Sequence, residues 1–244
     1  MQTLLIGIDD TDNLETRGTG YHARQLMDQL HKHNLAQVTG VTRHQLFFDD
    51  RVPYTSHNSS ACLSTLFDGD IDTLVNFCKT FMLSIAAEGS DVGLCIANTQ
   101  QAEAATDFGH RAKTEIVTQS QAQELADKMN IHLYGLTGDH QGIIGALSAC
   151  GLFVDGNDGR YIWAKGVREH ANETLPMHTL INVIGIDQVS VHNGNRLTVK
   201  EATIALGPWP RPIRKNNQSE LLVEKIDENR YQVLGKDIIK AIRP

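Results

Sequence analysis

The sequence of 244 residues contains only four cysteines, Cys62, Cys78, Cys95 and Cys150. No two of them stand at C-x-x-C spacing, so a zinc ribbon is not expected. Each cysteine lies among apolar neighbours in the sequence. The four are therefore predicted to be small buried thiols that stay reduced.

Two kinds of hydrophobic segment are also missing. The N-terminus has no basic segment followed by a long apolar run, so no signal peptide is expected. No stretch reaches the ~18 apolar residues of a membrane helix. The chain is predicted to be cytoplasmic and to have no membrane partner.

Positive charge is scarce. The 22 Lys and Arg residues are outnumbered by 29 Asp and Glu residues, which gives a formal net charge of -7. A general nucleic-acid binder usually needs a basic face, so this balance disfavours that class. Hydrophobic residues make up 41% of the chain, enough for the packed core of one large domain or two small ones.

The N-terminal pattern predicts an α/β (α+β) fold. Apolar runs, alternating segments and amphipathic periodicity follow one another as strand, helix, strand, strand, helix and strand. This order is that of the ferredoxin-like βαββαβ element. The strands are expected at 4–8, 38–47, 61–67 and 92–97, and the helices from residue 19 onward and at 70–86.

The remainder of the chain changes character near Gly156. Before it, the pattern predicts two helices within 100–130, a strand at 131–134 and a helix at 143–150. After it, helical periodicity fades and Val, Ile and Thr dominate, with a hairpin expected at Asn193-Gly194. We therefore expect a nucleotide- and metal-binding region at 1–155 and a β-rich second domain at 156–244.

The motif I-G-I-D-D-T-D at 6–12 places Asp9, Asp10 and Asp12 directly after a predicted buried strand. Ligands of α/β proteins gather at the carboxyl ends of strands. Like charges this close repel by roughly 1 kcal/mol per pair in water and about 4 at an effective dielectric of 20. Mg²⁺ bound with phosphates compensates such a cluster. The alternative is a solvated turn in which Asp12 or Asn13 caps a helix.

Gly18, Thr19 and Gly20 stand where the first helix is expected to begin. The hydroxyl of Thr19 can cap that helix. The flanking glycines also let a phosphate approach the helix N-terminus, where anions are favoured. Thr19 is accordingly either a cap or a phosphoryl acceptor.

Two polar loops are further candidates for ligand contact. The loop at 53–61 offers Thr55, Ser56, His57 and Asn58, which either hold phosphate or sugar oxygens or form a plain turn. The loop at 138–142 leads into a helix and either seats an anion or contributes Asp139 as a cap. It lacks the P-loop and G-x-G-x-x-G patterns. Its candidate residues are His140, Gln141 and Gly142.

Taken together, these motifs resemble the archaeal isoleucine-tRNA 2-agmatinylcytidine synthetase family. The matching features are I-G-I-D-D-T-D, a Thr seven residues later, P-x-x-[ST]-x-x-x-x-A and G-[IV]-I-G-A-L-x-A-x-G, at 6–12, 19, 53–61 and 142–151. The resemblance implies a kinase-like domain beside a ferredoxin-like one, with ATP and Mg²⁺ at Asp9, Asp10 and Asp12. It also implies that Thr19 becomes autophosphorylated, and that a tRNA cytidine is phosphorylated and joined to agmatine.

The sequence departs from that family at charged positions. Thr55 and His57 stand where the family has Lys and Arg, and His140-Gln141-Gly142 replaces G-R-G. Two phosphate-neutralising charges are thus missing from the 53–61 loop, although His57 is a titratable partial substitute. The family's OB-fold and zinc ribbon, which grip tRNA, are not expected in this chain.

Together with this resemblance, the motifs predict a Mg²⁺-dependent, ATP-using transferase or ligase, and the resemblance implies that it activates a small substrate for attack by an amine such as agmatine. A tRNA partner is expected only together with another chain. Two alternatives stay open, a tRNA-modifying subunit that acts on cytidine and a non-catalytic nucleotide-binding regulatory protein. The sequence specifies no oligomeric state.

Overall fold

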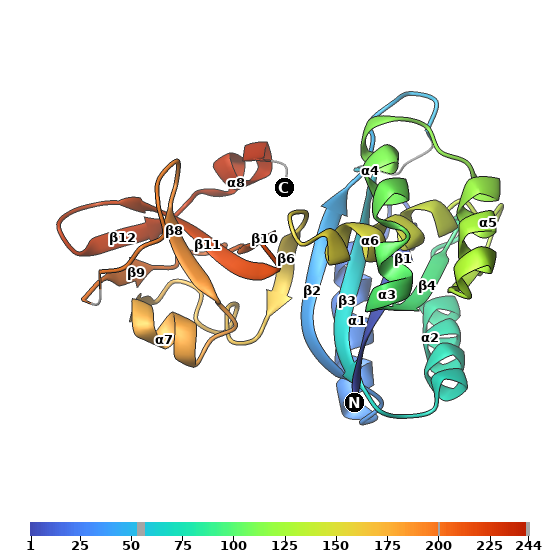
Figure 1. Cartoon of the computed structure of the whole chain (residues 1–244), viewed down its shortest axis with the longest axis horizontal. Coiled ribbons are helices and arrows are strands. Elements are labelled where there is room, and N and C mark those ends of the chain that lie inside the picture. The colour runs from blue at the N-terminus through green and yellow to red at the C-terminus, as the bar shows by residue number, and fades with distance from the viewer. Residues whose placement is uncertain (53–56, 200, 243–244) are drawn as a thin grey trace. The chain divides into compact units, whose positions relative to one another are not determined.

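The computed structural model describes residues 1–52, 57–199 and 201–242. It divides the chain into two compact units, 1–155 and 156–244 (Figure 1). Together the described residues form a mixed α/β protein with eight helices and twelve strands. None of these helices combines the length and the apolar character that crossing a membrane requires.

The first unit opens with the predicted ferredoxin-like βαββαβ element. Its strands lie in the order β4-β1-β3-β2, and each neighbouring pair is antiparallel. β1 and β2 run in the same direction, with β3 between them. Since β1 and β3 pair from Gln2↔Phe67 to Ile8↔Ala61, the two strands are in contact along nearly their whole length. The element comprises β1 (Gln2–Asp9), α1 (Thr19–Lys32), β2 (Gln37–Gln45), β3 (Ser59–Phe67), α2 (Ile71–Ile85) and β4 (Gly93–Asn98).

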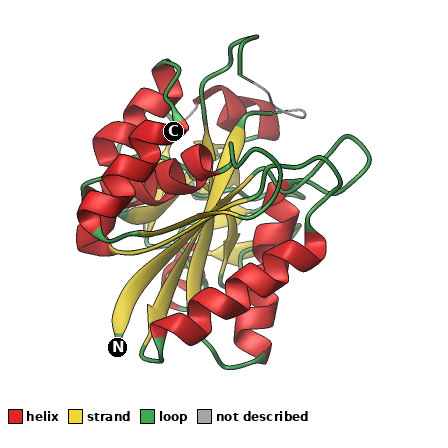
Figure 2. Ribbon diagram, turned by 90° about the vertical axis from the view of Figure 1, so that its right-hand side faces the viewer, coloured by secondary structure: helices red, strands yellow, loops and turns green. Residues whose placement is uncertain are grey.

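Helices cover both faces of this sheet (Figure 2). On one face α1 contacts β2 and β3, and α2 contacts β4. On the other face α6 (Ile143–Asp155) crosses β1, β3 and β4, and α4 (Thr106–Thr114) packs against α6. A fifth strand, β5 (His132–Gly135), extends the sheet beside β4, as the apolar run at 131–134 predicted.

A glycine on β1 allows α6 to come close to the sheet. Gly7 pairs with Cys62 on one side and with Cys95 on the other, and Cys150 of α6 lies above it. A Cβ atom at Gly7 would overlap the backbone of Ala146. All four cysteines of the chain are buried free thiols, which confirms the sequence prediction.

The stretch from 100 to 130 corrects the prediction of two helices. It forms three, α3 (Thr99–Glu103), α4 and α5 (Gln119–Met129). The break between α3 and α4 falls at Ala104 and Ala105, residues that favour helix, so no local signal marks it. Tertiary packing decides the break, because Gly151 of α6 presses against the carbonyl group of Ala105.

The second unit is rich in strands, as predicted, but also has two short helices, α7 (Met177–Asn182) and α8 (Lys236–Ile242). Its strands run in the order β6-β10-β11-β12-β9-β7, and β8 pairs with β11. At Asn193-Gly194 the chain makes the expected turn, closed by an isolated bridge between Ser190 and Arg196. The strands are β6 (Arg160–Ala164), β7 (Thr174–Pro176), β8 (Gln188–Val191), β9 (Thr203–Ala205), β10 (Ile213–Lys215), β11 (Gln218–Lys225) and β12 (Arg230–Val233).

Candidate active site

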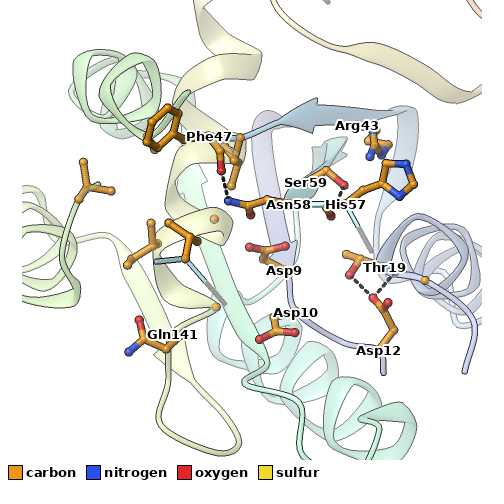
Figure 3. Close-up of a pocket in the computed structure, with 18 of the residues that line it drawn as sticks. Asp9, Asp10, Asp12, Thr19, Arg43, Phe47, His57, Asn58, Ser59 and Gln141 are labelled. Atoms are coloured by element: carbon orange, nitrogen blue, oxygen red, sulfur yellow. Dashed lines mark hydrogen bonds between the residues drawn. The ribbon is translucent and has the colours of Figure 1, made fainter. Parts of the chain in front are cut away.

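A cavity of about 240 Å³ lies in the first unit, where β1 and β2 end and β3 begins (Figure 3). It has a polar side, supplied by the acidic motif, the start of α1 and the start of β3. It also has an apolar side, supplied by the segment after β2 and the connection between α4 and α5. The described lining residues are Asp9, Asp10, Asp12, Gly18, Thr19, Gly20, Arg43, Leu46, Phe47, Val52, His57, Asn58, Ser59, Ala112, Glu115, Ile116, Val117, Gln141, Gly142, Ile144 and Gly145.

Asp9 and Asp10 lie at the carboxyl end of β1, and Figure 3 shows both side chains pointing into the cavity. Asp9 is the last residue of the strand, and its carboxylate lies against the first turn of α6. A Cβ atom at Gly145 would overlap Asp9 Oδ2, so a larger residue there would displace the carboxylate or the helix. Asp10 has a φ of 50°, which turns the chain sharply, and its Oδ2 accepts the N–H of Asp91 at 3.3 Å.

The charge of these two carboxylates is poorly compensated by the protein. Burial, followed by repulsion from Asp10, raises the pKa of Asp9 to about 8. Burial also raises the pKa of Asp10 to about 6, and the neighbouring Asp91 and Asp12 carboxylates add to the shift. A cation bound between Asp9 and Asp10 would favour their ionised forms.

The three predicted metal ligands do not converge on one point. Within the described part of the chain, no group of three His, Cys, Asp or Glu side chains is arranged to hold a metal ion. Asp12 is directed to the start of α1, where its Oδ1 accepts the N–H and the hydroxyl of Thr19, each at 2.9 Å. Of the three aspartates, Asp12 is therefore the one engaged at the start of α1.

Thr19 does not cap α1, which corrects one of its two predicted roles. It is the first residue of the helix, the cap position is Gly18, and Gly18 offers no side chain. The side chain of Asp12 accepts the exposed helix N–H group instead, from seven residues earlier in the chain. The hydroxyl of Thr19 lies at the cavity wall, where it meets side chains rather than the helix backbone.

A buried hydrogen-bond chain stands behind Thr19. Thr11 Oγ1 lies 3.2 Å from Thr19 Oγ1 and 2.8 Å from His22 Nδ1. The backbone N–H of Thr11 also points to Thr19 Oγ1, at 3.4 Å. Thr11 is 0% exposed, His22 6% and Thr19 7%, so water has little access to these groups.

The loop at 138–142 is fastened by Asp91, which the sequence analysis did not single out. Asp91 Oδ1 accepts the N–H of Asp139 at 2.7 Å, and the Asp91 carbonyl accepts the N–H of Gly142 at 2.9 Å. Gln141 and Gly142 consequently line the cavity. His140 is not among the described lining residues, because a left-handed turn (φ 66°) places its side chain against Gly135.

The loop before β3 contributes His57 and Asn58 to the cavity, whereas Thr55 and Ser56 lie outside the described residues. Asn58 Nδ2 donates to the Phe47 carbonyl at 2.8 Å. The backbone carbonyl of Asn58 accepts the N–H of Leu46 at 2.9 Å. These bonds join the entry of β3 to the exit of β2. Asn58 thereby connects the polar side of the cavity to its apolar side.

Sequence reasoning missed the apolar side and one cation. Leu46, Phe47, Ile116 and Val117 come from segments that carried no motif. The backbone bond from Phe47 N to the Ala112 carbonyl, 3.0 Å long, holds the segment after β2 against the end of α4. Arg43 is the one Lys or Arg among the described lining residues, and its charge acts to lower the pKa of Asp9. Its place in a strand of alternating pattern, two residues before the strand ends, was the available signal.

Comparison with known proteins yields likeness in structure alone. No family model matches the sequence, and no curated protein matches it. Among solved structures, apo TiaS, a tRNA agmatidine synthetase, superposes on 62% of this chain with a TM-score of 0.54 and 23% identity. The complex of TiaS with tRNA and ATP superposes on 62% of this chain with a TM-score of 0.55 and 23% identity. A tRNA fluorescent labeling enzyme superposes on 62% with a TM-score of 0.55 and 24% identity.

This chain corresponds to only 35–36% of the length of those structures. At such identity the likeness is one of fold. Over 62% of its length, this chain therefore has the fold of the tRNA agmatidine synthetase structures.

Proposed function

We propose that the cavity binds Mg-ATP and that the chain is an ATP-dependent phosphoryl transferase. The observation that carries this proposal is the juxtaposition of two poorly compensated carboxylates, Asp9 and Asp10, with an apolar wall in one cavity. A phosphate chain with its metal fits the side that carries the two carboxylates, and a nucleobase fits the apolar wall. The fold shared with a protein crystallised with ATP adds support.

The donor set suits Mg²⁺. This ion prefers oxygen ligands, and it is usually held by one or two carboxylates together with substrate phosphates and water rather than by a complete protein cage. Asp9 and Asp10 would supply the carboxylates, and phosphate oxygens and water would supply the remaining ligands. When bound, the metal neutralises charge on the phosphate oxygens.

The apolar wall suits the base of the nucleotide. Leu46 and Val117 are buried, and Ile116 is 42% exposed at the cavity. An aromatic base placed against such side chains would remove apolar area from water, worth roughly 25 cal/mol per Å². Arg43 and His57 lie on the polar side, where they would face phosphate or sugar oxygens.

At the phosphate end, Thr19 is placed to accept or to orient the transferred group. As acceptor, Thr19 Oγ1 forms a bond to the γ-phosphorus, the bond from that phosphorus to the β-phosphate oxygen breaks, and ADP leaves. The hydroxyl proton passes to Asp12 Oδ1, which already accepts it at 2.9 Å. Gly18 and Gly20 leave the start of α1 open to the phosphate. The phosphoryl group would then pass from Thr19 Oγ1 to an oxygen of a small substrate, Thr19 would regain its proton, and an amine such as agmatine would displace the group as phosphate.

A second candidate is a tRNA-modifying subunit whose RNA contacts come from another chain. The fold shared with structures of a tRNA-bound protein favours it, whereas the net charge of -7 favours a small substrate. Mass spectrometry of small molecules that co-purify with the protein would distinguish the substrate classes.

The proposal is tested by thermal unfolding with and without Mg-ATP. A ligand that binds only the folded state adds about 2.7 kcal/mol to the free energy of unfolding when its concentration is a hundredfold above Kd. This added stability raises the melting temperature. Asp10→Asn should remove most of this gain, and Asp68→Asn, outside the cavity, should keep it. If millimolar Mg-ATP shifts nothing in the wild type, the site does not bind it. Binding without release of ADP would instead indicate a regulatory protein.

A further inference from the structure

The hydrogen-bond chain behind Thr19 has a direction that follows from counting its protons. The carboxylate of Asp12 can only accept, so the single hydroxyl proton of Thr19 points to Asp12 Oδ1 at 2.9 Å. Thr19 Oγ1 must then act as acceptor toward Thr11, whose hydroxyl lies 3.2 Å away. That bond uses the only hydroxyl proton of Thr11.

His22 completes the count. Thr11 Oγ1 has given its proton to Thr19, so at its 2.8 Å contact with His22 Nδ1 it must accept. As long as Thr11 donates to Thr19, the ring must therefore carry its proton on Nδ1. Burial lowers the pKa of His22, which favours the neutral ring, and a neutral ring has one N–H to place on either nitrogen.

The opposite tautomer would have a definite consequence. With the proton on Nε2, His22 Nδ1 would accept from Thr11, and the Thr11 hydroxyl would turn away from Thr19. Thr19 Oγ1 would keep only the weaker 3.4 Å approach of the Thr11 N–H. The buried positions of Thr11 and His22 leave little access for a water to replace the lost donor from the side behind Thr19.

We propose that His22 is a positioning residue. It acts through Thr11 to hold the Thr19 hydroxyl in the orientation in which it donates its proton to Asp12. The Thr11 hydroxyl then occupies one lone pair of Thr19 Oγ1 and restricts rotation about the Cβ–Oγ1 bond. The second lone pair meets only the long 3.4 Å approach of the Thr11 N–H, so it is the one that would turn to the transferred phosphoryl group. This role of His22 rests on the proposed phosphoryl transfer. The hydrogen bonds that link His22, Thr11 and Thr19 are present whether or not that reaction takes place.

The experiment compares two substitutions of His22. In His22→Asn, the amide nitrogen takes roughly the place of Nδ1 and keeps a donor for Thr11, whereas His22→Leu fills the site without one. We expect His22→Leu to lower phosphoryl transfer from Mg-ATP by about 10- to 100-fold, the usual cost of losing a supporting hydrogen bond. His22→Asn should retain most of the rate, and His33→Leu, at the far end of α1, should leave it unchanged.

A double substitution and a spectroscopic measurement separate this role from simple packing. In a Thr11→Val background, His22→Leu should cause no further loss, because the connection is already cut. Nitrogen-15 NMR of the free protein, with His22 signals identified by their absence in His22→Asn, should show the Nδ1–H tautomer.

The Nε2–H tautomer, or equal rates in His22→Leu and His22→Asn, would overturn the positioning role while the proposed function stands. Absence of transfer by the wild type would overturn the proposed function, and the role of His22 with it. The tautomer would still report whether the hydrogen-bond chain runs in the inferred direction.

Discussion

Asp12 Oδ1 accepts two hydrogen bonds from Thr19, one from the backbone N–H and one from the hydroxyl, and both are 2.9 Å long. The backbone bond satisfies a helix N–H that Gly18 cannot reach. The hydroxyl bond points the proton of a potential nucleophile toward a carboxylate. One contact therefore combines a structural role with the proposed catalytic one, and substitutions separate the two.

Thr19→Ala removes the hydroxyl but keeps the backbone bond to Asp12. Loss of one hydrogen bond to a carboxylate should cost about 1–3 kcal/mol of stability. If Thr19 receives the phosphoryl group, turnover should fall far more than this loss explains, and Thr19→Ser should keep activity. Intact-mass analysis after incubation with Mg-ATP should show one added phosphate that Thr19→Ala lacks. A phosphate that persists in Thr19→Ala, with unchanged turnover, would contradict the acceptor role.

The raised pKa of Asp9 predicts how stability depends on pH in metal-free buffer. Below about pH 4 the carboxyl is protonated in both folded and unfolded states. Between the ordinary value of 3.8 and about 8 the unfolded chain has released the proton while the folded one still holds it, so the free energy of unfolding falls as pH rises.

Asp9→Asn removes this titration. With EDTA present, the variant should melt at a higher temperature than the wild type at pH 8, by at least a few degrees. The difference should shrink as the pH is lowered toward 4. Thermal unfolding of both proteins across this range measures it, and a difference independent of pH would show that burial does not hold the proton on Asp9.

Gly145→Ala tests the close approach of α6 to Asp9. The added Cβ would overlap Asp9 Oδ2, so either the carboxylate or the helix must shift. Such overpacking typically costs about 1–3 kcal/mol. We expect the stabilisation by Mg-ATP to be lost as well. Gly235→Ala, whose Cβ would meet nothing within 4 Å, is the control. Full retention of ligand stabilisation in Gly145→Ala would mean that Asp9 need not lie where it does.

Ile116→Ser tests the apolar wall. Ile116 is 42% exposed at the cavity, so its replacement should change stability by no more than about 0.5 kcal/mol. Loss of contact with a bound base should cost ~1–2 kcal/mol of binding, which is about a 5- to 30-fold rise in Kd. Ile238→Ser, 41% exposed on α8, should leave nucleotide affinity unchanged. Calorimetric titration gives both constants. If Ile116→Ser bound the nucleotide with the same Kd as the wild type, the base would not contact this wall.

Binding to tRNA should be weak for the isolated chain. With a net charge of -7, we expect a Kd no tighter than about 10⁻⁴–10⁻⁶ M at physiological salt, the range of non-specific binding. Filter binding at several salt concentrations measures the affinity and its salt slope. A sub-micromolar complex selective for one tRNA would favour the tRNA-modifying alternative.

Local sequence was sufficient for the first half of the architecture and for the acidic motif. The βαββαβ order was readable because strand alternation and helical periodicity are properties of short segments. Asp9 and Asp10 were identified because they directly follow an apolar run, and the end of a strand is where ligands collect. Burial of the cysteines followed from their apolar neighbours in the sequence.

Tertiary structure alone decided the rest. The apolar wall joins residues near 46 with residues near 116, and no local pattern links segments so far apart. Sequence left open whether Asp12 or Thr19 serves the start of the first helix, and the fold decided for Asp12, because the chain turns back between them and brings Asp12 Oδ1 to the Thr19 N–H. Helix α3 ended at two alanines because α6 presses on Ala105 there. Propensity describes what a segment favours by itself, whereas contacts between distant segments are set by how the elements pack.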